Sequence, residues 1–170
     1  MFQSGEKVVY GNNGVYEVLD ITTLDSAKAD KTKLYYVLKS ISTGAAAYVP
    51  TDSTVYLRPV MSKAEAEVLI RSIPEISAAK LSASNPKELP RLCKEILSSH
   101  DQRRIIGLIK HLKENEQKKH LQRKKLSATE ERYLAHALMV LGSELVCALG
   151  IEKSEIDKRI MDAIDTKWQI

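Results

Sequence analysis

Two β-patterned segments around a Gly11-Asn12-Asn13-Gly14 link constrain the start of this chain more than any other feature. Residues 7–10 and 15–21 are rich in β-branched and aromatic side chains, which favour extended strands. Glycine and asparagine tolerate the positive φ angles of a tight turn, so the link predicts a β-hairpin. After residues 56–61 the pattern changes to helical spacing and keeps it to the end. We therefore expect a small β module followed by a helical one.

The rest of the first 60 residues predicts three more short strands. They are expected near residues 33–41, 45–49 and 55–60, with turns at 42–44 and at Pro50. Short strands joined by such turns favour a small curled antiparallel sheet or an SH3/Tudor-like barrel. The expected fold class is α+β, in which this β domain precedes an all-α helical bundle.

Capping residues mark five helix starts in the second half. The expected N-caps are Ser62, Asn85, Ser99, Ser127 and Ser154, each with Glu, Gln or Asp three residues later. The helices are expected near residues 62–73, 86–98, 100–117, 128–149 and 154–166. Residues 77–85 are mostly small and predict a linker and a domain boundary. The expected organisation is a β domain at 1–61, a helix and linker at 62–84, and a helical domain at 85–170.

Positive charge is concentrated in one stretch of the helical half. The formal net charge is +4, and residues 101–125 alone hold nine Lys or Arg against three Asp or Glu. Residues 118–125 carry five of these cations and no acid. A basic stripe on a helical module is typical of phosphate binding, and a solvated helix face is the other interpretation. The alternative function is a protein-only adaptor whose basic face binds an acidic partner.

Signals for catalysis, metal binding and membrane insertion are weak. The chain has no phosphate-binding Gly motif, and neither Cys93 nor Cys147 has a second ligand at chelating spacing. We therefore expect no enzyme activity, no cofactor and no metal. The two distant cysteines are expected to be buried thiols of a reducing compartment. With no signal-peptide pattern and no long apolar run, we expect a cytoplasmic monomer without a membrane partner.

Ordered motifs along the chain resemble a known family. They are Val8-Val9-Tyr10 with Gly14-Val15, Tyr35-Tyr36-Val37-Leu38, Val49-Pro50 with Leu57-Arg58-Pro59-Val60, Leu126-Ser127-Ala128-Thr129-Glu130 with Leu134, and Leu141-x-x-Glu144-Leu145. In this order and spacing the chain resembles the CarD/CdnL-type family of bacterial RNA polymerase-binding transcription regulators. The resemblance covers almost the whole chain.

The resemblance implies separate roles for the two halves. The Tudor-like domain would dock on the β subunit of RNA polymerase, with Tyr48, Val49 and Pro50 at the contact; the family often has Arg where this chain has Tyr48. The helices would contact promoter DNA at the upstream edge of the bubble, mainly through its backbone, and modulate open-complex stability. The residues expected to bind DNA are Lys87, Arg91, Lys94, Lys118, Lys119, Arg123, Lys124 and Lys125.

One departure from the family concerns an apolar DNA contact. The family places a Trp early in the helical domain, where it wedges into the minor groove. By spacing, Pro86 stands near that position here, and the one Trp of the chain is Trp168. A basic residue that follows the family Trp aligns near Arg91, so the resemblance implies a phosphate contact there.

Overall fold

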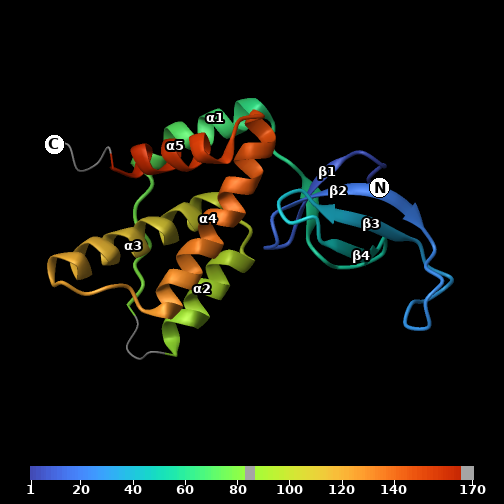
Figure 1. Ribbon diagram of the computed structural model, residues 1–170, viewed down its shortest axis with the longest axis horizontal. Helices are drawn as coiled ribbons and strands as arrows, with labels where there is room; N and C mark the ends of the chain where they lie inside the picture. The colour runs from blue at the N-terminus through green and yellow to red at the C-terminus, as the bar shows by residue number, and fades with distance from the viewer. Residues whose placement is uncertain (83–86, 166–170) are drawn as a thin grey trace. The chain divides into compact units, whose positions relative to one another are not determined.

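The computed structural model describes residues 1–82 and 87–165, and the chain divides into two compact units. The first unit is Met1–Val60 and the second is Met61–Ile170. The first is built on a sheet and the second on helices (Figure 1). The α+β class expected from the sequence is confirmed. Asn85, Pro86 and Trp168, which the sequence singled out, lie outside the described residues.

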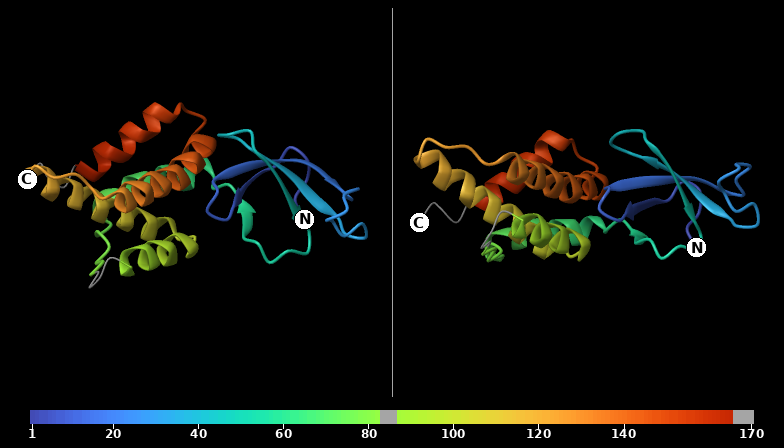
Figure 2. Two further views of the ribbon diagram at one scale, coloured as in Figure 1. Left: turned by 60° about the horizontal axis from the view of Figure 1, so that its bottom comes forward. Right: turned by 90° about the horizontal axis from the view of Figure 1, so that it is seen from below.

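The first unit is one antiparallel sheet of five strands. They are β1 (Lys7–Tyr10), β2 (Val15–Thr22), β3 (Tyr35–Ser40), β4 (Ala46–Pro50) and β5 (Leu57–Pro59), in the order β4-β3-β2-β1-β5. The predicted hairpin joins β1 to β2, where the Tyr10 N–H donates to the Gly14 carbonyl at 3.0 Å. Gly14 has a φ of 88°, which explains a glycine there. The strands are strongly twisted (Figure 2), and their inner side packs around Val8, Val18 and Leu38.

The second unit contains five α-helices and a 3₁₀ turn among its described residues. They are α1 (Lys63–Ser72), η1 (Ile73–Glu75), α2 (Glu88–Ser98), α3 (Gln102–Leu121), α4 (Ala128–Leu149) and α5 (Lys153–Asp165). The capping boxes predicted at Ser62 and Ser127 are confirmed, because each hydroxyl accepts from the N–H three residues on and each Glu accepts in return.

Three of the predicted caps are wrong. The N-cap of α2 is Lys87, not Asn85, and it makes no side-chain cap bond. The N-cap of α3 is Asp101, whose carboxylate accepts from the backbone N–H groups of Arg103 and Arg104. Ser99 instead ends α2, because the chain reverses only at His100, whose φ is 54°. The last helix begins at Lys153, so Ser154 lies inside its first turn. A predicted capping pattern thus locates a helix start to within a residue or two, since adjacent polar side chains compete for the position.

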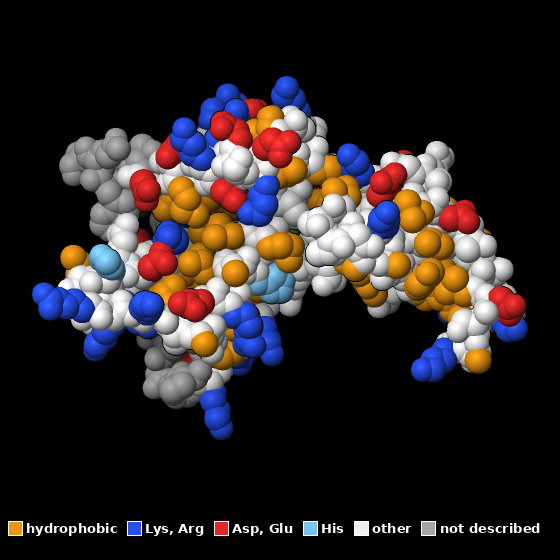
Figure 3. Space-filling view, viewed as in Figure 1, with side chains coloured by type: hydrophobic (Ala, Val, Ile, Leu, Met, Phe, Trp, Pro, Cys, Tyr) orange, Lys and Arg blue, Asp and Glu red, His pale blue; other side chains and the backbone are white. Residues whose placement is uncertain are grey.

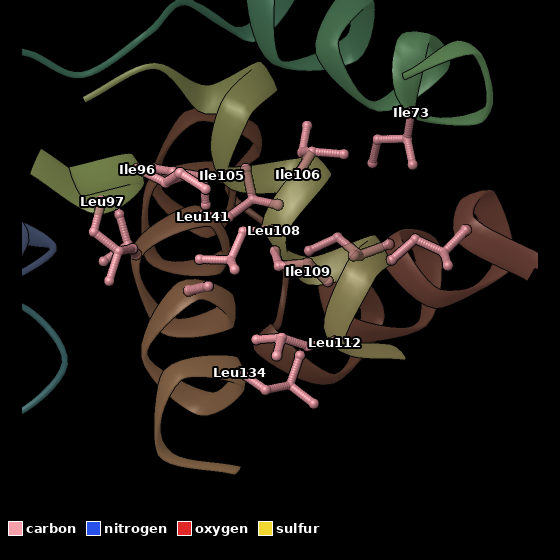
Figure 4. Close-up of a cluster of buried hydrophobic side chains, with 14 of the residues drawn as sticks. Ile73, Ile96, Leu97, Ile105, Ile106, Leu108, Ile109, Leu112, Leu134 and Leu141 are labelled. Atoms are coloured by element: carbon pink, nitrogen blue, oxygen red, sulfur yellow. The ribbon is translucent and has the colours of Figure 1, made fainter. Parts of the chain in front are cut away.

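The core of the helical unit forms where α3 and α4 face each other (Figure 4). The predicted stripe on α3 is buried throughout, with Ile105, Leu108, Ile109 and Leu112 at most 1% exposed. On α4 the stripe is also buried, except that Leu138 is only partly covered. By length and composition α4 would also suit a membrane span, and half of its most apolar window is buried in this core. Burial against other helices is the ordinary reason for an apolar helix of this kind.

The segment after η1 is bound firmly to α3. Lys110 is only 5% exposed, and its ammonium donates to the Ile73 carbonyl at 2.5 Å and to the Ile76 carbonyl at 2.7 Å. The Ala79 N–H donates to the Gly107 carbonyl at 2.8 Å. A Cβ at Gly107 would lie 3.1 Å from a backbone oxygen of this segment, so the close approach favours glycine. Of the small residues expected to form a linker, Ala79 therefore packs against α3.

Candidate interaction surfaces

The outer side of β4 carries main-chain groups that are not directed at another strand of the sheet. β4 is an edge strand that pairs with β3 alone. The Ser40 N–H donates to the Ala45 carbonyl at 2.8 Å, which fixes the residues of this strand that face β3. Because bonded pairs alternate along an antiparallel ladder, the N–H and C=O of Ala46 and Tyr48 point away from β3. An added strand has these four groups to pair with.

Pro50 limits how far such an added strand can run. Its position on the ladder is also outward-facing, and proline has no N–H to donate. Its carbonyl already accepts from the Ser53 N–H at 3.0 Å. The available edge therefore ends near Tyr48. Proline at such a position is a common way to shorten an exposed edge.

The three side chains predicted to bind the polymerase lie in different environments. Tyr48 is 55% exposed and faces outward, whereas Val49 is 2% exposed and packs in the sheet core. Pro50 is partly buried. The Val49 side chain is therefore not exposed for a contact, because alternation along a strand places it on the inner side next to an outward-facing Tyr48. Of the three, Tyr48 presents the largest exposed side chain.

The opposite edge of the sheet is less suited to strand addition. β5 has only three residues, and it ends at Pro59. The Gly11 N–H donates to the Tyr56 carbonyl at 2.8 Å, so Leu57 and Pro59 are the outward positions. Only Leu57 then has an outward N–H. Of the two edges, β4 therefore offers the longer run of main-chain groups.

The basic segment predicted between two helices is half helix and half turn. α3 continues to Leu121, past the expected end at residue 117. It then closes with the Arg123 N–H donating to the His120 carbonyl at 2.9 Å and the Lys124 N–H donating to the Lys119 carbonyl at 2.7 Å. This pair of bonds is a Schellman motif. Arg123 has a φ of 56°, although glycine is the usual residue at its position. We call residues 118–125 the α3–α4 tip.

Four of the five cations in the α3–α4 tip face solvent. They are Lys118, Arg123, Lys124 and Lys125, and none takes part in the salt bridges recorded for the described residues. Blue side chains gather at this end of α3 in Figure 3. Lys119 differs, because its ammonium lies 2.5 Å from the Glu130 carboxylate and its side chain is only 33% exposed. The sequence predicted all five as DNA contacts, whereas in the structure Lys119 forms an ion pair with Glu130 of the same unit.

Glu130 holds the α3–α4 tip against the start of α4. Its carboxylate accepts from the Lys119 ammonium and from the Ser127 N–H and hydroxyl, both at 2.8 Å. Burial by itself raises the pKa of a carboxyl, but here the bonds from Lys119 and Ser127 outweigh it and lower the pKa of Glu130. Glu130 therefore stays ionised at neutral pH. Its role in the L-S-x-x-E motif is to cap the helix and fix the tip.

The remaining predicted cations form a second, separate cluster on α2. Lys87 and Lys94 are exposed, while Arg91 lies 3.9 Å from Glu88 and 3.6 Å from Glu95. Glu95 also lies 3.7 Å from Arg104 in the first turn of α3. Arg104 and Lys118 are fourteen residues apart on one helix, which corresponds to about 21 Å. The structure thus places the eight predicted residues in two clusters, and the α2 cluster is partly neutralised by acids.

Sequence reasoning missed one residue of the α3–α4 tip. Leu121 is 85% exposed, although it is a leucine at the end of an otherwise charged segment. The apolar stripe of α3 stops at Leu112, so Leu121 has no place in it. The sequence could have identified Leu121 by this departure from the apolar spacing of α3. Among residues 1–82 and 87–165 no group of His, Cys, Asp or Glu is arranged to hold a metal ion.

Comparison with known families assigns each half of the chain. The model of the CarD-like/TRCF RID domain matches residues 2–61, and that of the CarD C-terminal domain matches residues 79–161. No curated protein matches the chain. The sheet lies within the first match, and α2, α3 and α4 lie within the second. With both domains present in the family's order, this chain belongs to the CarD-like family, whose members regulate transcription through interaction with RNA polymerase.

Proposed function

We propose that this protein is a non-enzymatic regulator that binds the β subunit of RNA polymerase through its sheet and promoter DNA through its helical unit. The observation that carries the proposal is the α3–α4 tip, where four exposed cations lie on a hydrogen-bonded turn in a chain with an RNA polymerase-interacting domain. By holding DNA next to the polymerase, the protein would change the stability of the open complex. The upstream edge of the bubble is the expected place of contact.

The polymerase contact is proposed at the β4 edge. Ala46 and Tyr48 direct their main-chain groups outward, and the Tyr48 side chain lies exposed beside them. An added strand from the polymerase would bond to these groups and pack on the Tyr48 ring. Tyrosine suits this position because it offers a large apolar surface and a polar end.

Substitutions at Ala46 test this docking mode. Ala46→Pro removes one outward N–H and leaves the bonds to β3 intact, so binding of the full chain to RNA polymerase should weaken about tenfold, the equivalent of one hydrogen bond worth ~1.4 kcal/mol. Ala46→Val keeps the N–H and should bind like the wild type. Tyr48→Ala should also weaken binding. Equal affinity of Ala46→Pro and Ala46→Val, with both proteins folded by circular dichroism, would place the docking site elsewhere.

The DNA contact is proposed at the α3–α4 tip, with the α2 cluster in support. Exposed cations release counterions from DNA when they contact phosphates, and they do so whatever the sequence. The exposed cations of the α3–α4 tip that can contact phosphates in this way are Lys118, Arg123, Lys124 and Lys125. Lys119 and Arg91 are already paired with carboxylates, so they are expected to contribute less.

The salt dependence of binding measures the contribution of the α3–α4 tip. Replacing Lys124 and Lys125 with Ala should reduce the slope of log K against log salt by about 1.8 on double-stranded DNA, at ~0.9 per phosphate contact. The matched control replaces Lys28 and Lys39, two exposed lysines of the sheet unit, and should leave the slope unchanged. If both pairs change the slope equally, only net charge matters. Failure of promoter-fork DNA to bind would favour the adaptor function with an acidic protein partner.

A further inference from the structure

The exposed leucine of the α3–α4 tip has no packing role. Leu121 is the last residue of α3 and is 85% exposed, and among the large apolar residues that the structure describes only Met1 is more exposed, at 89%. Among the described residues of the helical unit Val68 on α1 comes next, at 57%. An isolated exposed leucine is ordinary on a protein surface. Leu121 differs because it stands among cations on the most basic segment of the chain.

The turn after Leu121 holds it in a fixed position. The two bonds of the Schellman motif join Lys119, His120, Arg123 and Lys124 around it. In most such motifs glycine occupies the third of these positions, and apolar residues at the first and last contact each other. Here all three positions are cationic, and the single apolar side chain points to solvent instead. Lys118 lies on the same helix face as Leu121, because residues three apart are neighbours on a helix.

We infer that Leu121 contacts unstacked bases and makes the α3–α4 tip selective for distorted DNA over intact duplex. This inference rests on the proposed DNA-binding function. The cations around Leu121 can pair with DNA phosphates, but beside the phosphates of an intact duplex there is no apolar surface for the leucine to contact. Where a base step is unstacked, the faces of the bases are exposed and accept an apolar side chain. Lys118 and Lys124 then contact the phosphates on either side.

An anionic membrane surface fits the α3–α4 tip less well. Helices that lie in the membrane interface bury a continuous apolar stripe along their length. The last turn of α3 offers Leu121 alone, between Gln117, Lys118, His120 and Gln122. A single apolar side chain with flanking cations is better matched to one opened step of a nucleic acid.

The test compares two DNA probes with the full chain. One is an intact 30-base-pair duplex, and the other has the same sequence with a short unpaired bubble. Leu121→Gln keeps the length and the net charge of the protein, so it should bind the bubble about fivefold more weakly and the duplex equally well. Leu121→Phe should keep the preference for the bubble. Val68→Gln, at an exposed apolar site on α1, is the matched control and should change neither affinity.

A fluorescent base at the bubble edge reports the contact directly. 2-Aminopurine brightens when it unstacks, so the wild type should increase its signal more than Leu121→Gln does at saturating protein. The inference is overturned if Leu121→Gln keeps both the bubble preference and the signal while the Lys124 and Lys125 variant still lowers the salt slope. It is also overturned if Leu121→Gln loses binding only to vesicles containing anionic lipid. If the wild type binds neither DNA probe, the proposed function fails together with the inference.

Discussion

Replacing Arg123 with glycine should stabilise the protein and weaken its DNA binding at once. Arg123 is held at a φ of 56°, in the left-handed region where a Cβ is unfavourable. Glycine at this position of a Schellman motif avoids that cost, which is about 1 kcal/mol for one residue. For a helical unit of this size, 1 kcal/mol corresponds to a rise in Tm of ~4 °C.

The variant Arg123→Ala separates conformation from charge. It removes the same cation as Arg123→Gly, so both variants reduce the repulsion among the cations of the α3–α4 tip equally. Only Arg123→Ala keeps a Cβ in the left-handed conformation. Arg123→Gly should therefore be more stable than Arg123→Ala by about 1 kcal/mol, measured by urea unfolding of the full chain. On DNA both variants should show the same loss in salt slope, about 0.9 for one phosphate contact.

Two results would refute this reasoning. Equal stability of the glycine and alanine variants would mean that the turn does not hold residue 123 in the left-handed conformation. An unchanged salt slope in both variants would mean that Arg123 does not reach a phosphate. If the prediction holds, the chain keeps a cation at a site where glycine would stabilise the fold, as expected when strain is retained at a functional position.

Three further predictions concern buried polar groups and thiols. Lys110→Met leaves the buried carbonyls of Ile73 and Ile76 without their donor, so it should lower the free energy of unfolding by about 1–3 kcal/mol, whereas exposed Lys158→Met should have little effect. Folding lowers the pKa of Glu130, so its ionised carboxylate contributes to the free energy of unfolding above the unfolded pKa, and this contribution is lost as pH falls through the folded pKa. The difference in the free energy of unfolding between the wild type and Glu130→Gln, measured by urea unfolding, should therefore shrink below about pH 4.5. Burial, and then the charge of Glu130, raises the pKa of Cys93 to about 11, so a thiol reagent at pH 8 should modify Cys93 only when the protein unfolds. Native Cys93 that reacts as fast as a small thiol would contradict the packing of α2.

The sequence by itself determined the α+β class and most of the elements. The Gly11–Gly14 hairpin, the capping boxes at Ser62 and Ser127 and the apolar stripe of α3 are local patterns, and each depends on residues within a few positions. The ordered motifs also identified the CarD-like family, which both family models confirm. The basic character of residues 118–125 was evident from composition alone.

Tertiary structure decided which of these residues are free to act. Val49 and Tyr48 are adjacent in sequence, yet the pairing of β4 with β3 buries one and exposes the other. Lys119 is as basic as its neighbours, but the approach of α4 brings Glu130 to it. Leu121 is exposed because, among the described residues, the contact of α4 with the end of α3 covers Lys119 and leaves the side chain of Leu121 uncovered. The physical reason is common to all three: a side chain's exposure and its charge partners depend on segments that are distant in the chain, and local patterns carry no information about them.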